Sequence, residues 1–99
     1  MRLEFDPEKS AHNERERGLP FGAAIGLFDS VRLEWEDRRK DYGEIRISTL
    51  GEIEARVFFA TFTRREEEIV RIISFRKANA RETKRYREYL CTRGAGSAD

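Results

Sequence analysis

The sequence has one cysteine, one histidine and no long apolar run. Each of these features argues against a class of protein to which the chain could belong. A lone Cys91 excludes a disulfide framework and a cysteine-based zinc site within the chain. A Ser–His–acid triad would have to use His12, which lies on a polar segment where we expect an ordinary exposed residue. Nothing in the pattern brings Ser74 to it, so acyl-transfer hydrolysis is not expected.

Membrane and metal-binding classes are equally poorly supported. No stretch approaches the roughly 18 apolar residues of a membrane span, and the first residues lack a signal-peptide pattern, so we expect a cytoplasmic protein. No carboxylate cluster has metal-ligand spacing and no glycine run has a phosphate-loop pattern. We therefore expect neither a metal nor a cofactor.

What is abundant is charge and aromatic side chains. Hydrophobic residues make up 38% of the 99 residues and aromatic residues 11%, which is enough for one small packed core. We expect a single domain over residues 1–91 and a disordered tail over 92–99, where glycine and serine gather.

The charge is unevenly placed although the net charge is only +1. The segment from Arg71 to Arg93 holds eight basic side chains against two acidic ones, Glu82 and Glu88. A basic segment of this kind suits phosphate groups, an acidic protein partner or simply a solvated helix face, and the pattern alone leaves all three open.

Local signals predict an α+β fold with two N-terminal helices, a four-stranded antiparallel meander and a C-terminal helix. The helices are expected at Pro7–Arg17, capped by Asp6 and ended by Gly18, then from Pro20 with apolar spacing, and at Ala78–Leu90. The strands are expected at 31–36, 44–49, 55–62 and 69–75, with a further short strand at 2–5. Turns are expected at 37–43, at Gly51-Glu52 and at 63–68.

The residue pattern along the second and fourth predicted strands indicates on which face of the sheet each side chain lies. If Ile45, Ile47 and Thr49 face the core helices, Glu44 and Arg46 face the opposite side of the sheet. The fourth strand has large apolar residues in both phases, which predicts a central strand covered on both sides. We expect one side of a curved sheet to be lined by Glu44, Arg46, Arg64, Arg71 or Arg76, and Tyr86. Cross-strand ion pairing that only satisfies charges is the alternative.

A set of arginines with one glutamate and one tyrosine suits RNA cleavage without a metal ion. The RNA 2′-hydroxyl supplies the nucleophile, so the protein has to orient that oxygen and stabilise the charge that develops on the phosphate. Arginine can do the second task but remains protonated, so a separate group must move protons. Glu44 is the candidate base, and Tyr86 a donor or orienting group.

Several motifs resemble the BrnT family of ribonuclease toxins from type II toxin–antitoxin pairs. They span about residues 3–90 and comprise Phe5-Asp6-Pro7-Glu8-Lys9, Asn13 and Gly18, Phe21 with Ala24 and Phe28, Glu44-Ile45-Arg46-Ile47, Leu50-Gly51, Thr63-Arg64, and Arg71 to Ala78 followed by Glu82 and Tyr86. The resemblance implies a RelE-like fold and an endoribonuclease that inhibits translation. It also implies a cognate ribbon-helix-helix, BrnA-like antitoxin that neutralises the toxin and through which the pair binds operator DNA and represses its operon.

Carried over residue by residue, the resemblance supports as catalytic Glu44, Arg46, Arg64, Arg76 and Tyr86. Further RNA contacts are expected at Arg65 and, within the basic segment, at Lys77, Arg81, Lys84 and Arg85. The sequence departs from the family where Lys-His-Gly is usual, since it has Glu16-Arg17-Gly18, and where Glu82-Thr83 replaces Glu-Arg. Two alternatives follow, an inactive relative that serves as an antitoxin-binding co-repressor and a non-enzymatic RNA-binding module.

Overall fold

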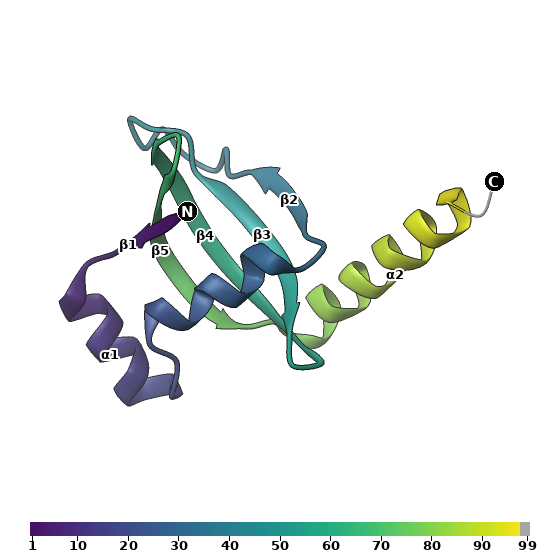
Figure 1. Cartoon of the computed structure of the whole chain (residues 1–99), viewed down its shortest axis with the longest axis horizontal. Coiled ribbons are helices and arrows are strands. Elements are labelled where there is room, and N and C mark those ends of the chain that lie inside the picture. The colour runs from purple at the N-terminus through teal and green to yellow at the C-terminus, as the bar shows by residue number, and fades with distance from the viewer. Residues whose placement is uncertain (98–99) are drawn as a thin grey trace.

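The computed structural model describes residues 1–97 as an α+β fold built on one five-stranded sheet (Figure 1). In chain order the elements are β1 (Arg2–Glu4), α1 (Pro7–Arg17), the 3₁₀ helix η1 (Phe21–Asp29), β2 (Leu33–Glu36), β3 (Ile47–Ile53), β4 (Arg56–Glu66), β5 (Ile69–Lys77) and α2 (Ala80–Ser97). The strand order is β1-β5-β4-β3-β2, with β1 parallel to β5 and every other pair antiparallel. The α+β class and the meander are confirmed, and the short N-terminal strand makes the sheet mixed.

Helix α1 begins and ends where the sequence predicts. The Asp6 side chain accepts a hydrogen bond from the Glu8 amide at 2.9 Å, and Pro7 occupies the first turn. Gly18 closes the helix in the left-handed region, with φ at 70°, and its amide donates to the Glu14 carbonyl. Both ends of this polar helix are therefore fixed by its own sequence.

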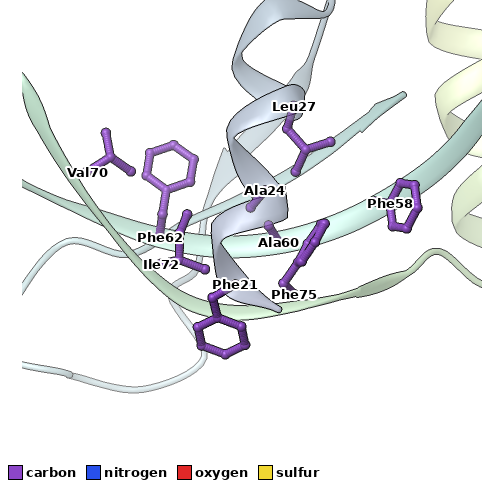
Figure 2. Packing of buried hydrophobic residues seen from close by; sticks show 9 residues of the cluster. All are labelled: Phe21, Ala24, Leu27, Phe58, Ala60, Phe62, Val70, Ile72 and Phe75. Atoms are coloured by element: carbon purple, nitrogen blue, oxygen red, sulfur yellow. The ribbon is translucent and has the colours of Figure 1, made fainter. Parts of the chain in front are cut away.

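The second predicted helix forms as the 3₁₀ helix η1, which covers one face of the sheet. Its buried residues are Phe21, Ala24 and Leu27, a spacing of three that matches the three residues per turn of this helix. Ile25 lies outside this three-residue spacing and is 44% exposed. The main core lies between η1 and the sheet, where η1 packs on Phe58, Ala60, Phe62, Val70, Ile72 and Phe75 (Figure 2).

Strand β3 runs through the turn expected at Gly51-Glu52. Both residues are paired within the sheet, and the chain reverses instead at Glu54 and Ala55, which have positive φ. Gly51 is required for a different reason, because a Cβ there would lie 2.9 Å from the Ser30 hydroxyl oxygen and 3.0 Å from Leu27. The glycine thus permits close packing of η1 on the sheet.

Two further strand predictions are wrong. The strand expected at 44–49 begins only at Ile47, so Glu44 and Arg46 precede it and Ile45 is 65% exposed rather than in the core. The central strand is β4, because β5 is paired on its outer side only along the short β1. Strand β4 also continues through 63–66, where a turn was expected.

Helix α2 is longer than predicted and packs on the opposite face of the sheet from η1. Val57 and Phe59 alternate with the main-core residues of β4 and join Leu50, Ala78 and Tyr86 in a second cluster. The helix continues to Ser97 through most of the predicted disordered tail, and residues 98 and 99 lie outside the described residues. Figure 1 shows its C-terminal half extending away from the sheet. Among the described residues no helix is long and apolar enough to cross a membrane.

A reciprocal pair of hydrogen bonds begins α2. The Glu82 amide donates to the Asn79 side chain at 2.8 Å, and the Asn79 amide donates to the Glu82 carboxylate at 2.9 Å. This is a capping box, in which two otherwise unpaired amides are satisfied. The sequence Asn79-Ala80-Arg81-Glu82 carries that signal, which fixes the start of the helix two residues after Ala78.

We expect Asn79→Ala to lower the free energy of unfolding by about 1 kcal/mol, the usual cost of losing a side-chain cap. Urea denaturation followed by circular dichroism measures the change. Lys84→Ala is the matched control, because the Lys84 side chain is 80% exposed and makes only a 4.0 Å ion pair with Glu88. Equal stability of the two variants would show that the capping box contributes nothing.

Candidate functional site

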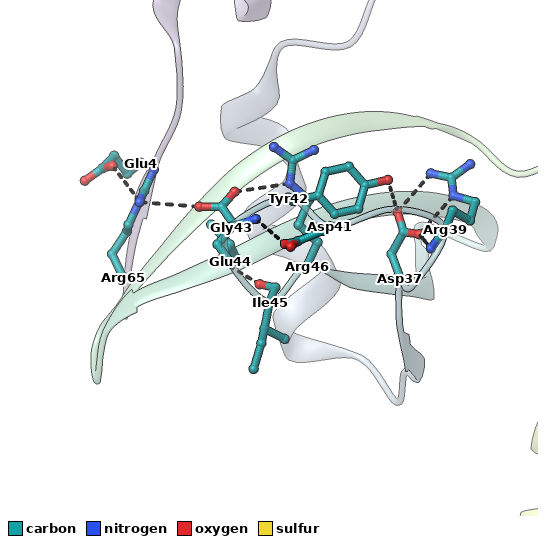
Figure 3. A network of polar contacts seen from close by, with 11 residues as sticks. Glu4, Asp37, Arg39, Asp41, Tyr42, Gly43, Glu44, Ile45, Arg46 and Arg65 are labelled. Carbon is teal, nitrogen blue, oxygen red and sulfur yellow. Dashed lines mark hydrogen bonds and ion pairs between the residues drawn. The ribbon is translucent and has the colours of Figure 1, made fainter.

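The loop that carries Glu44 and Arg46 is tied down by Asp37. The Asp37 carboxylate accepts hydrogen bonds from the Arg39 side chain at 2.9 Å through both Nε and Nη2, and from the Tyr42 hydroxyl at 3.2 Å. Its backbone amide donates to the Arg46 carbonyl at 2.8 Å. The hydrogen bonds from Arg39 hold the pKa of Asp37 well below its usual range. The loop therefore has a defined conformation at neutral pH (Figure 3).

Because the pKa of Asp37 is lower in the folded chain than in the unfolded one, ionised Asp37 stabilises the fold above the ordinary aspartate pKa of about 3.9. That contribution is lost as the pH falls through the lower folded-state value. We expect Asp37→Asn to destabilise the chain at pH 7 and to flatten its loss of stability in acid. Unfolding measured between pH 7 and pH 2 tests this, and identical acid profiles for the two proteins would contradict it.

Glu44 lies between two guanidinium groups. Its carboxylate accepts a hydrogen bond from Arg46 Nε at 3.1 Å and lies 3.6 Å from Arg65 Nη1. Arg65 also approaches Glu4 (Figure 3). Glu4 in turn accepts a 2.8 Å hydrogen bond from Arg71. Glu44 therefore holds Arg46 and Arg65 in place, with one carboxylate oxygen facing each guanidinium. The Arg46 guanidinium stacks on the Tyr42 ring at 4.1 Å, which fixes it further.

A hollow of about 390 Å³ opens beside this network. It is lined by Glu44, Ile45, Ile47, Thr63, Arg64 and Arg65. The Thr63 hydroxyl donates to the Ile45 carbonyl at 2.7 Å and joins the loop to β4. Arg64 lies over the Phe62 ring at 5.4 Å and is exposed, so its guanidinium can take an anion.

Arg76 is held at the far end of β5. Its two terminal nitrogens donate to the Glu82 carboxylate at 2.8 and 2.9 Å, and its guanidinium lies 4.3 Å from the Phe59 ring centre. These hydrogen bonds raise the pKa of Arg76 and lower the pKa of Glu82. Because Glu82 also caps α2, Arg76 is positioned by the start of that helix.

Arg76 borders hollows on both sides of β5. One hollow, of about 460 Å³, lies on the α2 face and is also lined by Trp35, Ser48 and Phe59. On this face three short polar residues pair across β3, β4 and β5, namely Ser48, Thr61 and Ser74. Their small side chains leave the surface of the sheet low and polar there. The second hollow, of about 620 Å³, lies against α1.

The α1 hollow brings together residues that the sequence analysis kept apart. Its lining includes Lys9, His12 and Arg17 from α1 and Ser74 and Arg76 from β5. Ser74 and His12 both line this hollow, but no hydrogen bond between them is found in the described residues, and Ser74 pairs with Thr61 across the sheet. The sequence signal for this hollow was the presence of Lys9, His12 and Arg17 on one predicted helix. The helical period could not show which strand that helix packs against.

Tyr86 does not reach Glu44. Its side chain is 2% exposed in the second cluster, and its hydroxyl donates to the Val31 carbonyl at 2.7 Å. Burial raises its pKa. Tyr86 packs with Val57 of β4, whereas the Glu44 network lies beside Thr63 of the same strand. Val57 and Thr63 are six residues apart, which is roughly 20 Å at about 3.3 Å per residue. The predicted proximity of Tyr86 and Glu44 is wrong because α2 packs at the other end of the strand.

The guanidinium groups likewise do not converge on one spot. Arg76 pairs with Phe59 of β4, whereas the Arg46 network lies beside Thr63 of that strand. Phe59 and Thr63 are four residues apart, which is roughly 13 Å at about 3.3 Å per residue. Arg46 and Arg76 each have a carboxylate partner, as the charge-pairing alternative anticipated. The structure therefore has two basic clusters along one sheet rather than a single anion site.

The five expected RNA-contacting side chains lie on three elements, β4, β5 and α2. Arg65 belongs to the Glu44 network, and Lys77 borders a smaller hollow together with Arg17, Leu19 and Arg76. The α2 residues Arg81, Lys84 and Arg85 are exposed. The Arg85 guanidinium also covers the Trp35 ring at 4.4 Å. Within residues 1–97, no three histidine, cysteine or carboxylate side chains gather as metal ligands would.

Comparison with known proteins identifies the family. A family model described as "Ribonuclease toxin, BrnT, of type II toxin-antitoxin system" matches residues 5–82. The match contains the α1 hollow, the Glu44 network and Arg76, and it ends at Glu82 in the first turn of α2, before Tyr86. No curated protein sequence matches.

Among solved structures, the chain is similar to the crystal structure of the Brucella abortus ribonuclease toxin BrnT, with a TM-score of 0.59 and 21% sequence identity. The match covers 80% of this chain and 97% of that chain. This likeness concerns the fold, and the family match rests on sequence. Together with the motifs in order along the chain, these findings show that the chain belongs to the BrnT family of ribonuclease toxins of type II toxin–antitoxin systems.

Proposed function

We propose that this chain is an endoribonuclease toxin that cleaves RNA without a metal ion and inhibits translation in the cytoplasm. The observation that carries the proposal is the position of Arg76, a residue that lines two hollows beside β5 and whose guanidinium is held by Glu82 over the Phe59 ring. The family supports ribonuclease activity in general, and the residues, mechanism and RelE-like arrangement are proposed here.

In the proposed reaction the RNA 2′-oxygen attacks the neighbouring phosphorus and the bond to the 5′-oxygen breaks. The products are a 2′,3′-cyclic phosphate and a 5′-hydroxyl end. Arg76 stabilises the charge that builds up on the phosphate oxygens, and its pairing with Glu82 holds the guanidinium in place before RNA arrives. Phe59 beneath it adds a flat apolar support.

The strand of RNA extends from Arg76 toward the Glu44 network. Arg46, Arg64 and Arg65 bind flanking phosphates there, and Glu44 orients Arg46 and Arg65. At the other end Arg81, Lys84 and Arg85 of α2 and Lys77 of β5 contribute positive charge. Tyr86 acts at a distance, because it anchors α2 and thereby the Glu82 that positions Arg76.

A type II family implies a protein antitoxin. We propose that it is a ribbon-helix-helix, BrnA-like protein that neutralises the toxin and through which the complex binds operator DNA. Carboxylates on such a partner would meet the arginines of the two basic clusters, which would also block RNA.

The test is incubation of the purified chain with RNA at low salt in excess chelator. We expect fragments with cyclic phosphate ends. Matched substitutions are Arg46→Ala within the proposed site and Arg15→Ala on the exposed surface of α1, and only the first should slow cleavage. RNA that is bound with a steep salt dependence but left intact would favour an RNA-binding module. Failure to cleave or arrest growth, with the antitoxin still bound, would favour a co-repressor.

A further inference from the structure

The proposed reaction needs a group that accepts the proton of the 2′-hydroxyl, and the two basic clusters do not supply one. Arginine stays protonated at neutral pH. Glu44 is engaged by Arg46 and Arg65, and the hydroxyl of Tyr86 already donates to a backbone carbonyl. The proton acceptor must therefore lie elsewhere within reach of Arg76.

The α1 hollow contains such a group. His12 is the one imidazole of the sequence, and it shares the hollow with Arg76 and Ser74. Histidine is the side chain that changes charge most readily between pH 5 and 8, which suits it to accept and return a proton. Its exposure leaves room for a nucleotide between α1 and β5.

Helix α1 is fixed against β5, so His12 has a defined position. The Asn13 side chain, next to His12, donates one hydrogen bond to the Phe75 carbonyl and one to the Leu19 carbonyl, each at 2.8 Å. The buried Ser10 hydroxyl accepts a hydrogen bond from the Phe21 amide at 2.9 Å. The bond to Phe75 connects α1 to the strand that carries Ser74 and Arg76, and the other two connect α1 to the following loop and to η1. A proton acceptor held this way loses little entropy when it acts.

The hollow has the chemistry of a nucleotide site. Lys9, Arg17 and Arg76 supply positive charge for phosphate, whereas Phe21 and Phe75 are buried core residues at the base of the hollow. The charged groups around His12 are Asp6, Glu8, Lys9 and Arg17 from α1 and its cap, and Arg76 from β5. Cations thus outnumber carboxylates among the charged groups in this lining, which favours an anionic ligand.

We propose that His12 is the general base of RNA cleavage and that the α1 hollow holds the nucleotide whose 2′-hydroxyl reacts. This inference rests on the proposed function. Neutral His12 takes the 2′-proton while the 2′-oxygen bonds to phosphorus and the bond from phosphorus to the 5′-oxygen breaks. The leaving oxygen takes a proton from water, and the resulting hydroxide is neutralised when His12 releases its proton.

The kinetic test compares wild type, His12→Gln and His12→Ala over pH 5 to 8. We expect His12→Gln to lower kcat by at least about 100-fold, the lower range for loss of a general base, and to abolish the rise in rate as the imidazole becomes neutral. Added imidazole should restore part of the rate to His12→Ala but none to Arg76→Ala. Arg15→Ala, on the same helix, controls for effects on α1. Cleavage by His12→Gln within twofold of wild type would overturn the inference.

A binding test separates this inference from the proposed function. Because His12 is the one histidine, protein made without a histidine tag gives a single imidazole signal in a ¹H–¹⁵N spectrum. Cytidine 3′-phosphate is the probe. We expect it to shift that signal in wild type and to do so far less in Arg76→Ala. Lack of cleavage by wild type would refute the proposed function, whereas an unmoved imidazole signal would refute the nucleotide site even if wild type cleaves.

Discussion

Arg76→Ala is expected to lower the rate of RNA cleavage by about 100- to 1,000-fold, the usual effect of removing one donor that stabilises an oxyanion. The reason is that Arg76 lines both hollows beside β5, and the Arg46 cluster lies too far along the sheet to replace it. Single-turnover cleavage of a labelled RNA measures the effect.

The structural role of Arg76 has to be separated from its chemical role. Removing the guanidinium also leaves Glu82 without its ion-pair partner at the start of α2. Arg76→Lys keeps the positive charge but loses the paired hydrogen bonds, and Glu82→Gln weakens the pair while Arg76 remains. We expect Arg76→Lys to be slow although folded, and Glu82→Gln to be much less impaired. Near-normal cleavage by folded Arg76→Ala would remove this residue from the site.

Tyr86→Ala is expected to lower the free energy of unfolding by about 3–5 kcal/mol, the range for truncating a large buried aromatic ring. The ring is among the largest fully buried side chains and joins α2 to Leu50 and Val57. Urea denaturation measures the loss. At the stability of an ordinary small domain, such a loss unfolds a large fraction of the molecules.

Tyr86→Phe distinguishes the buried role of Tyr86 from direct catalysis. It keeps the ring and removes the hydrogen bond to Val31, so we expect a loss of about 1 kcal/mol and cleavage within about twofold of wild type. A variant that is stable but at least 100-fold slower would show instead that the hydroxyl takes part in the reaction.

Features that depend on neighbouring residues were predictable from the sequence. The Asp6 and Gly18 ends of α1 follow from local capping rules, and the alternation along β4 and β5 follows from the two-residue period of a strand. The family motifs also identified Arg76 and the Glu44–Arg46 pair. The basic C-terminal segment correctly predicted exposed arginines and lysines on α2.

Features that depend on tertiary packing were not predictable. Gly51 resembles a turn residue but is needed because η1 packs closely on β3. The burial of Tyr86 depends on where α2 crosses the sheet, which its helical period does not specify. His12 and Ser74 share a hollow because Asn13 connects α1 to the backbone of β5, a contact between residues 62 positions apart. We expected Arg46 and Arg76 to meet at one site because both were placed on the same side of the sheet. They lie at different points along the strands and therefore do not meet.

The most direct test of the account uses an otherwise all-DNA oligonucleotide with one ribonucleotide, incubated with the purified chain in excess chelator. Attack by a 2′-hydroxyl on a phosphate held by Arg76 requires that ribonucleotide. The account predicts a single cut on its 3′ side, with a 2′,3′-cyclic phosphate on one product and a 5′-hydroxyl on the other. Cleavage of the all-DNA strand, or a cut that leaves a 5′-phosphate, would contradict it.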